Sequence, residues 1–600
     1  MAEQDTLLSK AKHVLTEHGS PRAQRAALVV FCLAIFLPSV FRGFVDPDET
    51  RYAEITREML ERGDWVIPHL NYVPYFMKPP LTYWVAAISV KLFGFHPWVL
   101  RLGPLLAAIL GVLATYEMGA AIGSRRTGLI AGAILATSIE YYALAVFFMT
   151  DMLFSAFLFV AWLAFWRHYQ ESGRRRAWIA LFWLCAGLAC FTKGPLGPAL
   201  LFFTIVIFLI LRRDWNFLGK MRPVTGLAIF AAVNLPWAIL VYHHDPRFVT
   251  FFYWRVNAAG VSDAALQHSE PFYYYLSRVP LGLFPWTLLA IAAIVAAATV
   301  TFGPARKTAP AGQVWLTSLF LGGVILLSIP KAKLATYSLP LFSAAAVITA
   351  DYLARIDGRS RVARFLVPLQ CLVAMSALMV FLLGWEMEHF KVSAFRLSLC
   401  IALAAGLASA VALLFAAVVS FRGRLGAGMW IMGISAAIIF PIAMILLPRV
   451  ASGQTSEVLC RRFRAELAAA DLIVVSQAKD FSVPLFVGRR VAVVGHASEL
   501  GMGLFVENQP AHLPIPNNPF QLKAGAIGSK YLLGIQELVT LWSSSSLIYL
   551  FASEKFLDKF LPLCPNVWTV GSNGHTTLLT NRDPAITRRP QRVMARELSR

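Results

Sequence analysis

Long apolar runs separated by short polar segments fill the first 450 residues of the chain. Thirteen of the runs are about 17 to 25 residues long, the length that an α-helix needs to cross a bilayer. We expect spans at 25–41, 98–122, 127–147, 151–168, 176–192, 195–212, 224–242, 280–302, 313–330, 334–352, 364–384, 396–420 and 428–448. The pattern therefore predicts a polytopic α-helical membrane protein.

One run leaves two topologies open. The run LTYWVAAISVKLFGF, at 81–95, is short, contains Lys91 and begins with two aromatic residues that suit a membrane interface. If it spans, all later loops change sides. If it lies on the surface, the arginine-rich segments at 125–126, 174–176 and 355–364 all face the cytoplasm, as basic loops generally do. The charge pattern thus favours thirteen spans with the N-terminus inside and the C-terminus outside.

This topology predicts the domain organisation. A cytoplasmic segment at 1–24 precedes a membrane domain at 25–452, whose outer loops include 42–97 and 243–279. After residue 453 a helical pattern and compact apolar runs such as DLIVVSQ and RRVAVVGH predict an extracytoplasmic α/β domain that ends near 583. A basic tail, 584–600, completes the chain and is expected to be disordered.

Composition narrows the classes of protein. The chain has 600 residues, 58% hydrophobic and 14% charged, with a mean hydropathy of +0.62. Its net charge of +21 resides largely in the short loops, so it indicates membrane topology rather than nucleic-acid binding. The polar N-terminal stretch is too long for a typical cleaved signal, so we expect a retained first span. The seven cysteines include no CxxC motif, and a disulfide between Cys460 and Cys564 stays open.

The acidic stretch DPDE, 46–49, has two interpretations. Asp46 suits an N-cap, Pro47 a first helical position and Glu49 a capping box, so the start of a helix explains all four residues. Asp48 would then simply occupy a first turn that favours negative charge. The alternative interpretation is that Asp48 takes part in catalysis.

The stretch YVPYFMKPPLTYW, 72–84, favours catalysis. It places Lys78 just before the interfacial helix, and Arg51 follows Asp48 by three residues on one helix face. A carboxylate with two cations at the membrane surface suits a phosphorylated, lipid-anchored substrate. The cations can hold phosphate while the carboxylate takes a proton from an acceptor.

These motifs resemble a known family. DETRYAEITREMLERGDWVIPHLNYVPYFMKPPLTYW is similar to the first outer loop of the bacterial aminoarabinose–lipid A transferases, relatives of the protein O-mannosyltransferases. The resemblance continues in order through FFMTDMLFSAFL, FTKGPLGPAL, HSEPFYYYL, IPKAKLATYSLPL and DFSVPLFVGRRVAVVGHASELG. It implies the GT-C glycosyltransferase fold, with about 13 transmembrane helices and juxtamembrane helices in the first outer loop.

The resemblance also implies roles for single residues. Asp48 resembles the family's catalytic carboxylate, with Glu49 beside it, and Asp151 matches a further acidic position of the active-site cavity. Arg51, Lys78 and Tyr337 resemble the groups that hold the phosphate of the lipid carrier. For Lys193, Lys333 and His268 a place in the cavity competes with ordinary positions at helix ends and in loops.

Two departures concern a metal. The aminoarabinose transferases usually have a glutamate before the Lys-Pro pair, where this chain has Met77, and a Glu-His pair where it reads FFYWRVNAAGV. A thioether cannot replace a carboxylate as ligand for a hard cation. We therefore expect no essential metal and no other cofactor, although a bound divalent ion is not excluded. The specificity for aminoarabinose is also open.

The resulting hypothesis is an integral glycosyltransferase of a bacterial inner membrane with a periplasmic active site. Its donor would be a polyprenyl-phosphate-linked sugar, and its acceptor lipid A, lipopolysaccharide, or another extracytoplasmic glycan or protein. We expect a monomer that contacts membrane lipids and no nucleic acid. Two alternatives remain: a lipid or solute transporter, and a degenerate family member without catalytic activity.

Overall fold

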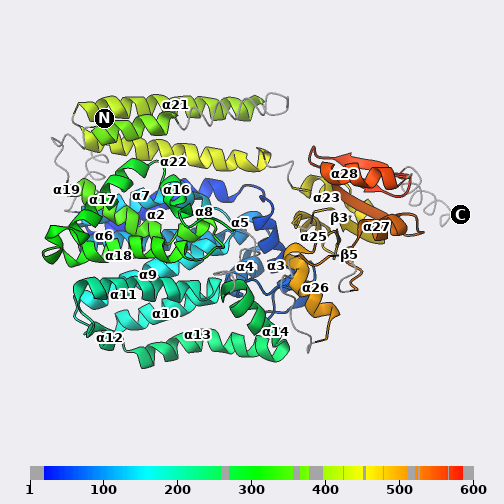
Figure 1. Ribbon diagram of the computed structural model, residues 1–600. Helices are drawn as coiled ribbons and strands as arrows, with labels where there is room; N and C mark the ends of the chain where they lie inside the picture. Colours follow the sequence, from blue (N-terminus) through cyan, green and yellow to red (C-terminus); the bar gives the residue numbers. More distant parts are fainter. Residues whose placement is uncertain are drawn as a thin grey trace. The chain divides into compact units, whose positions relative to one another are not determined.

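The structure, a computed structural model, describes residues 19–258, 269–355, 365–376, 396–422, 424–450, 455–477, 479–510, 521–523, 528–564 and 566–584. Figure 1 shows their helices and strands. The chain divides into two compact units. We call residues 1–42, 97–238 and 253–446 the helical unit, and residues 43–96, 239–252 and 447–600 the sheet unit. This grouping differs from the expected domain bounds, because it joins the first outer loop to the C-terminal region.

The helical unit contains long apolar helices joined by a few short ones. They are α2 (Pro21–Val40), α5 (Pro97–Leu100), α6 (Leu102–Ile122), α7 (Arg125–Ala136), α8 (Ile139–Ala145), α9 (Thr150–Gln170), α10 (Arg176–Lys193), α11 (Leu196–Arg212), α12 (Phe217–Lys220), the first part of α13 (Pro223–His244), α16 (Tyr274–Gly282), α17 (Thr287–Phe302), α18 (Ala311–Ser328), α19 (Leu341–Arg355), α21 (Arg396–Phe421) and most of α22 (Leu425–Val450). A further apolar helix is Phe365–Ser376.

Every predicted span overlaps one of these helices. Within the described ranges, eight helices are long and apolar enough to cross a membrane, or nine if one bent pair counts as a span. The chain is therefore a multi-pass membrane protein, as predicted. The exact number of thirteen spans stays a prediction, because helices such as α11 and α17 are short.

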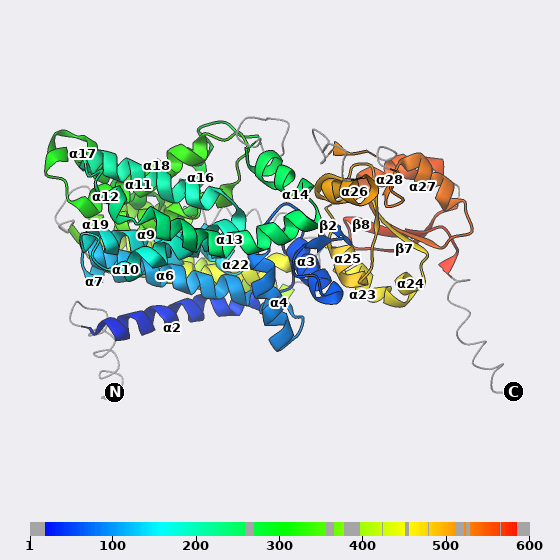
Figure 2. The same ribbon diagram turned by 90° about the horizontal axis from the view of Figure 1, so that it is seen from below.

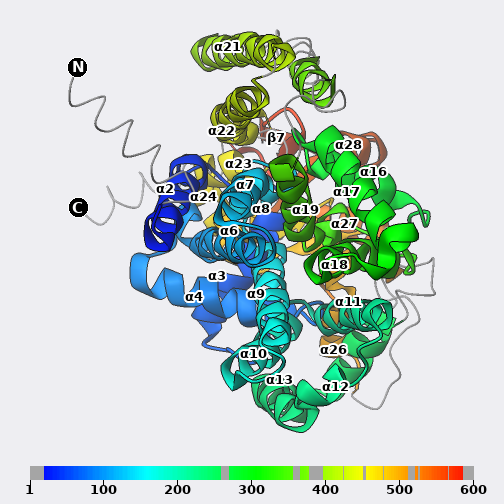
Figure 3. The same ribbon diagram turned by 90° about the vertical axis from the view of Figure 1, so that its left-hand side faces the viewer.

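Helix α9 lies at the centre of the helical unit. It packs between α6 and α10, as Figure 3 shows in a view along the bundle. In the most apolar 18-residue stretch of α9, 83% of the residues are buried, against 17% in the corresponding stretch of α13. Because α9 begins with Thr150 and Asp151, the end of this central helix carries one of the candidate acids into the packed interior.

The predicted span at 127–147 is not one straight helix. It is broken into α7 and α8, whose axes differ by 70°. At the break, the hydroxyls of Thr137 and Ser138 donate to the carbonyls of Ala133 and Ile134. Hydroxyl side chains that bond to the preceding turn in this way favour bending of a helix.

The sheet unit is built around six strands in the order β5-β4-β3-β6-β8-β7. These are β3 (Leu472–Val475), β4 (Ala492–Val494), β5 (Leu532–Leu533), β6 (Ile548–Ser553), β7 (Trp568–Ser572) and β8 (Thr576–Thr580). The first four in that order pair in parallel, whereas β8 and β7 are antiparallel additions. Two helices precede the strands, α23 (Glu457–Arg462) and α24 (Arg464–Ala468). Four lie between them, α25 (Ser482–Val487), α26 (Gly501–Asn508), α27 (Ile535–Trp542) and α28 (Glu554–Phe560), and all six are visible in Figure 2. The predicted C-terminal mixture of helices and strands is thus confirmed.

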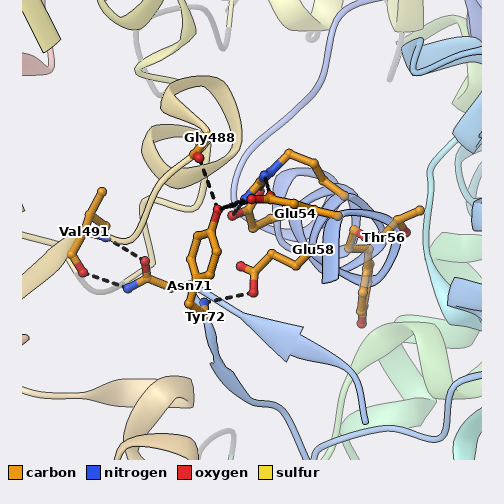
Figure 4. A network of polar contacts seen from close by, with 10 residues as sticks. Glu54, Thr56, Glu58, Asn71, Tyr72, Gly488 and Val491 are labelled. Atoms are coloured by element: carbon orange, nitrogen blue, oxygen red, sulfur yellow. Dashed lines mark hydrogen bonds and ion pairs between the residues drawn. The ribbon is translucent and has the colours of Figure 1, made fainter. Parts of the chain in front are cut away.

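The first outer loop contributes α3 (Asp48–Arg62), the hairpin β1 (His69–Leu70) and β2 (Val73–Pro74), and α4 (Leu81–Phe93) to the sheet unit. The hairpin turn joins it to the C-terminal region (Figure 4). Asn71 exchanges two hydrogen bonds of 2.8 Å with the backbone of Val491, and the Tyr72 hydroxyl donates to the Gly488 carbonyl. The backbone N–H of Tyr72 also donates to Glu58 on α3. The turn therefore ties α3 to residues about 420 positions later in the chain.

Helix α4, the ambiguous run of the sequence, has 13 residues and is too short to count as a span by itself. Its Ile88, Leu92 and Phe93 are exposed apolar side chains, whereas the Trp84 indole donates to the Trp65 carbonyl. An exposed apolar face on a short helix is typical of a helix that lies at a membrane surface. The orientation of the loops stays a prediction.

Cys460 and Cys564 are both buried thiols, and no disulfide joins them in the described structure. Cys564 belongs to the apolar core around β6 and α28.

Candidate active site

The stretch DPDE does not cap α3 in the predicted way. The helix begins at Asp48, and Pro47 stands in the capping position without a side-chain bond. Asp46 instead accepts a hydrogen bond from the Thr50 hydroxyl, and Glu49 accepts one of 3.0 Å from the backbone N–H of Val45. Asp46 is therefore not the N-cap, because its carboxyl faces a hydroxyl four residues onward. Glu49 is fully buried, and its partner is the nearby backbone of Val45. Asp48 does not cap the helix.

Asp48 and Arg51 form the first part of the candidate site. The Arg51 guanidinium bonds to Asp48 through one terminal nitrogen, and to Glu499 at 2.5 Å through the other. The side chains of Arg51 and Glu499 are 11% and 12% exposed, whereas that of Asp48 is 45% exposed. Arg51 also lies over the Tyr52 ring, 4.9 Å from its centre. The arrangement presents an accessible carboxylate beside a largely buried cation.

Sequence reasoning missed Glu499. It lies in the short helix η6 (Ser498–Leu500), directly after Ser498, whose φ is +49°. The stretch that carries the family resemblance contains Glu499, but its local pattern is that of an ordinary polar loop residue. Only the packing of the C-terminal region against α3, within the sheet unit, reveals that it is the second partner of Arg51.

Several buried polar atoms around Arg51 have no hydrogen-bond partner among the described residues. They are the Arg51 Nε, one carboxylate oxygen of Glu499 and the Tyr83 hydroxyl. Tyr75 is also close by, and burial, reinforced by the charge of Glu499, raises the pKa of its hydroxyl. Buried donors and acceptors are nearly always satisfied in folded proteins, so this concentration is typical of a site that receives a polar ligand.

Lys78 and Met77 follow β2 in the segment before α4. Both are partly buried in the sheet unit, as is the hairpin residue Tyr72. Lys78 thus belongs to the same unit as Asp48 and Arg51. Its role in phosphate binding stays a prediction.

Asp151 and Lys193 form a second group, inside the helical unit. Lys193, at the end of α10, donates to Asp151 at 2.5 Å, and their side chains are 4% and 5% exposed. The ammonium also lies 4.2 Å from the centre of the Tyr337 ring, in η3 (Ala335–Ser338). The structure therefore brings together three of the predicted residues. Tyr337 lies before α19, not within the helix that the predicted span at 334–352 implied.

Glu140, on α8, is a residue of this second group that the sequence did not reveal. Its carboxyl lies near Asp151, Lys193 and the Ser338 hydroxyl, and one of its oxygens is buried without a partner in the described chain. A Cβ atom at Gly282 would come within 2.3 Å of the other oxygen, so a larger residue there would displace the Glu140 carboxyl. The available signal in the sequence was the pair of hydroxyl residues Thr137 and Ser138, which favour a bend of the helix just before Glu140.

The additional cavity candidates have different outcomes. Lys333 is 3% exposed and donates at 2.9 Å to the carbonyl of Glu270, whose N–H bonds to the Lys331 carbonyl. It therefore fastens two loops of the helical unit to each other, which is a structural role. His268 lies outside the described residues.

No group of three or more His, Cys, Asp or Glu residues with the geometry of a metal site occurs in the described part of the chain. A cavity of about 340 Å³ lies between Trp166, Gln170, Gln313 and Arg355. It is at the opposite end of α9 from Asp151, about 25 Å away at 1.5 Å per residue, and contains none of the candidate residues.

The chain is similar to glycosyltransferases of known families. Residues 24–252 match the family of dolichyl-phosphate-mannose-protein mannosyltransferases. The chain is 32% identical over 335 residues to the undecaprenyl phosphate-alpha-4-amino-4-deoxy-L-arabinose arabinosyl transferase of Edwardsiella ictaluri, which is 55% of this chain and 59% of that protein. Its counterpart in Erwinia tasmaniensis is 31% identical over 333 residues, with the same shares covered. The chain thus spans less than two thirds of the curated relatives it matches.

The fold is similar to that of ArnT from Cupriavidus metallidurans. The crystal structure bound to undecaprenyl phosphate gives a TM-score of 0.76 at 20% identity and covers 94% of this chain and 99% of that chain. The apo structure gives 0.75 at 21% identity with the same coverage. The chain therefore has the GT-C fold, and the resemblance found in its sequence is confirmed.

Proposed function

We propose that this protein is a membrane glycosyltransferase that moves a sugar from a polyprenyl-phosphate donor to an extracytoplasmic acceptor. The arabinosyl transferases that it resembles are named for an undecaprenyl-phosphate-linked sugar, and the ArnT structure of similar fold holds undecaprenyl phosphate. The acceptor would be lipid A, lipopolysaccharide, or another glycan or protein. Because Met77 departs from the family pattern, the transferred sugar need not be aminoarabinose.

The observation that carries this proposal is the unsatisfied polar lining around Arg51. A bound donor would offer acceptors to the Arg51 Nε and the Tyr83 hydroxyl, and a sugar hydroxyl as donor to Glu499. Guanidinium groups bind phosphate through paired hydrogen bonds, and Lys78 would add a second positive charge. The family resemblance assigns Tyr337, in the helical unit, a role in phosphate binding, and this role stays a prediction.

The proposed reaction is a displacement at the anomeric carbon of the donor. An acceptor oxygen forms a bond to this carbon while the bond to the phosphate oxygen breaks, and polyprenyl phosphate leaves with the electron pair. Arg51 and Lys78 stabilise the charge that develops on the phosphate. If the acceptor is a hydroxyl, Asp48 takes its proton. If the acceptor is an ionised phosphate, Asp48 only orients it.

The charges of the site suggest how donor binding and the base are connected. Without donor, Arg51 is shared by the carboxylates of Asp48 and Glu499. A donor phosphate that binds Arg51 competes with the more exposed partner, Asp48, because Glu499 is held in a largely buried position. Donor binding would therefore release the Asp48 carboxylate toward the acceptor.

The proposal includes the predicted orientation in a bacterial inner membrane. The N-terminus would be cytoplasmic, and the Asp48 site and the C-terminal region periplasmic. Cysteine labelling of intact and permeabilised cells tests this arrangement. Residues 60, 260 and 520 should react from outside, and 175, 218 and 360 only from inside. Reaction of 175 or 360 from outside would mean that α4 spans the membrane.

The function is tested by assaying the purified full chain in nanodiscs for transfer from radiolabelled polyprenyl-phosphate sugars to extracted lipopolysaccharide. The expected result is acceptor labelling that Asp48→Asn abolishes. The control is Glu61→Gln, which alters another exposed carboxylate on the same helix. Movement of the donor lipid across vesicles without any sugar transfer would instead indicate a transporter. Binding without either activity would indicate a non-catalytic relative.

A further inference from the structure

Two acids of the sheet unit, Asp46 and Asp480, lie close to the start of α3. Asp480 precedes α25, and its two carboxylate oxygens accept hydrogen bonds from the hydroxyls of Ser482 at 2.6 Å and Ser456 at 2.7 Å. The same Ser482 hydroxyl accepts from the Ser456 backbone N–H at 2.9 Å. Asp46 borders this group, because Ser482 also lies within hydrogen-bonding reach of its carboxyl. One hydroxyl thus bridges two carboxyl groups.

The hydroxyl groups around Asp46 and Asp480 have too few protons to donate one to every carboxylate oxygen. Thr50 and Thr455 each have a hydroxyl proton to offer Asp46. Ser482 has a single hydroxyl proton, which it donates to Asp480, so toward Asp46 it can only accept. The second carboxyl oxygen of Asp46 is buried and accepts no hydrogen bond of ordinary geometry from the described residues. A proton on Asp46 would supply the missing donor and remove the repulsion between two neighbouring negative charges.

The surroundings offer no compensating cation. On α23, Glu457 is paired with Arg461, and the buried Cys460 thiol lies close to both acids. On α3, Asp48 is paired with Arg51, and Glu49 accepts from a backbone N–H. Within the described residues, neither Asp46 nor Asp480 has an ion-pair partner. Burial, and then the charge of Asp480, raises the pKa of Asp46 to about 7, and burial raises that of Asp480.

The position of the pair connects it to the site. Asp46 precedes Asp48 by two residues, and α25, which begins at Ser482, packs against α3. We propose that Asp46 and Asp480 share one proton and that this carboxyl–carboxylate pair fixes the start of α3, so that Asp480 is a positioning residue for Asp48 and Arg51. The consequence for catalysis rests on the proposed function, whereas the shared proton does not.

The sign of the pH dependence follows from the raised pKa. The folded protein holds the shared proton up to about pH 7, whereas the unfolded chain releases it near the usual carboxyl value of about 4. The folded state therefore binds more protons between these values, and its stability falls as the pH rises from about 4 to about 7. Above this range both groups are ionised, and the start of α3 is held less firmly.

The test measures thermal unfolding of the full-length protein in nanodiscs between pH 5 and pH 8.5. The wild-type midpoint should fall by several degrees as the pH rises, and Asp46→Asn and Asp480→Asn should each remove a large part of this fall. The control is Glu58→Gln, which removes one of the buried acids of α3. Burial and the neighbouring Glu54 raise the pKa of Glu58. In that variant the part due to Asp46 and Asp480 should remain. If both asparagine variants keep the wild-type slope, the pair does not share a proton.

A transfer assay over the same pH range tests the positioning role. The wild type should lose several-fold in kcat above about pH 7, and Asp480→Asn should flatten this decline. A flattened unfolding profile with an unchanged decline in kcat would overturn the positioning role. Absence of sugar transfer in every variant, with the unfolding profiles as expected, would contradict the proposed function and leave the shared proton established.

Discussion

Asp151 and Lys193 in the helical unit have side chains that are 5% and 4% exposed, whereas Asp48 in the sheet unit keeps 45% of its side-chain surface accessible beside a buried Arg51. Asp151 and Asp48 are both carboxylates that pair with a cation. The charges of Asp151 and Lys193 have lost their hydration and depend on each other, so they are fixed in place. The exposed carboxylate can leave its partner when a ligand arrives. The comparison favours the proposed role of Asp48 in proton transfer, and a structural role for the Asp151 pair within the helical unit.

The largest expected effect separates these roles at Asp48. Asp48→Asn keeps the size of the side chain but removes its basicity, so we expect a loss of about 10² to 10⁴ in kcat. Its stability should change by less than about 1 kcal/mol, since the side chain is partly exposed in the first turn of the helix. Transfer assays and thermal unfolding measure the two quantities. Glu61→Gln should alter neither, and near wild-type activity of Asp48→Asn would refute its role as a base.

The second effect concerns the buried pair. Lys193→Met removes the ammonium that pairs with the buried Asp151 carboxylate, which should destabilise the protein by about 3 to 5 kcal/mol. The double variant with Asp151→Asn should recover much of this stability, because no unpaired charge remains. The exposed pair of Glu171 and Arg175 provides the control, since Glu171→Gln should have little effect. If Lys193→Met alone is as stable as the wild type, the buried Asp151 carboxylate does not need the ammonium.

The third effect tests whether the exposed site depends on the C-terminal region. Asn71→Ala removes two hydrogen bonds to Val491 and leaves its N–H and carbonyl groups unsatisfied, which should cost about 1 to 3 kcal/mol. Limited proteolysis should then cleave the first outer loop faster. Asn508→Ala is the matched control, because the Asn508 side chain bonds within its own helix. Unchanged cleavage in Asn71→Ala would mean that other contacts hold α3.

The smallest expected effect is that of chelation. Met77 stands where the resembling transferases have a carboxylate, so EDTA should leave the rate of transfer unchanged within error. Measurement of the rate before and after chelation, with readdition of divalent ions, tests this. Loss of activity that a divalent ion restores would show that other residues of the chain bind an essential metal.

Much of the architecture could be predicted from the order of the residues. Apolar runs of bilayer length identify helices because every backbone polar group must be satisfied within the segment that crosses lipid. The helix that carries Asp48 was predicted from its capping residues, and the short helix within 81–95 and the C-terminal strands from hydrophobic patterns, which are all local signals. The motifs around Asp48, Arg51 and Lys78 were specific enough to indicate the family.

What the sequence could not reveal were pairings between distant residues. Glu499 reaches Arg51 across 448 positions, and Glu140 joins Asp151 and Lys193 only because α7 and α8 bend apart at Thr137. The position of Asp46 was mispredicted, since a good N-cap residue turned out to face Thr50 and a second buried acid. Local propensity determines which segments become helices and strands. Which charges meet is decided by tertiary packing, because a buried charge is stable only beside partners that the folded chain brings to it.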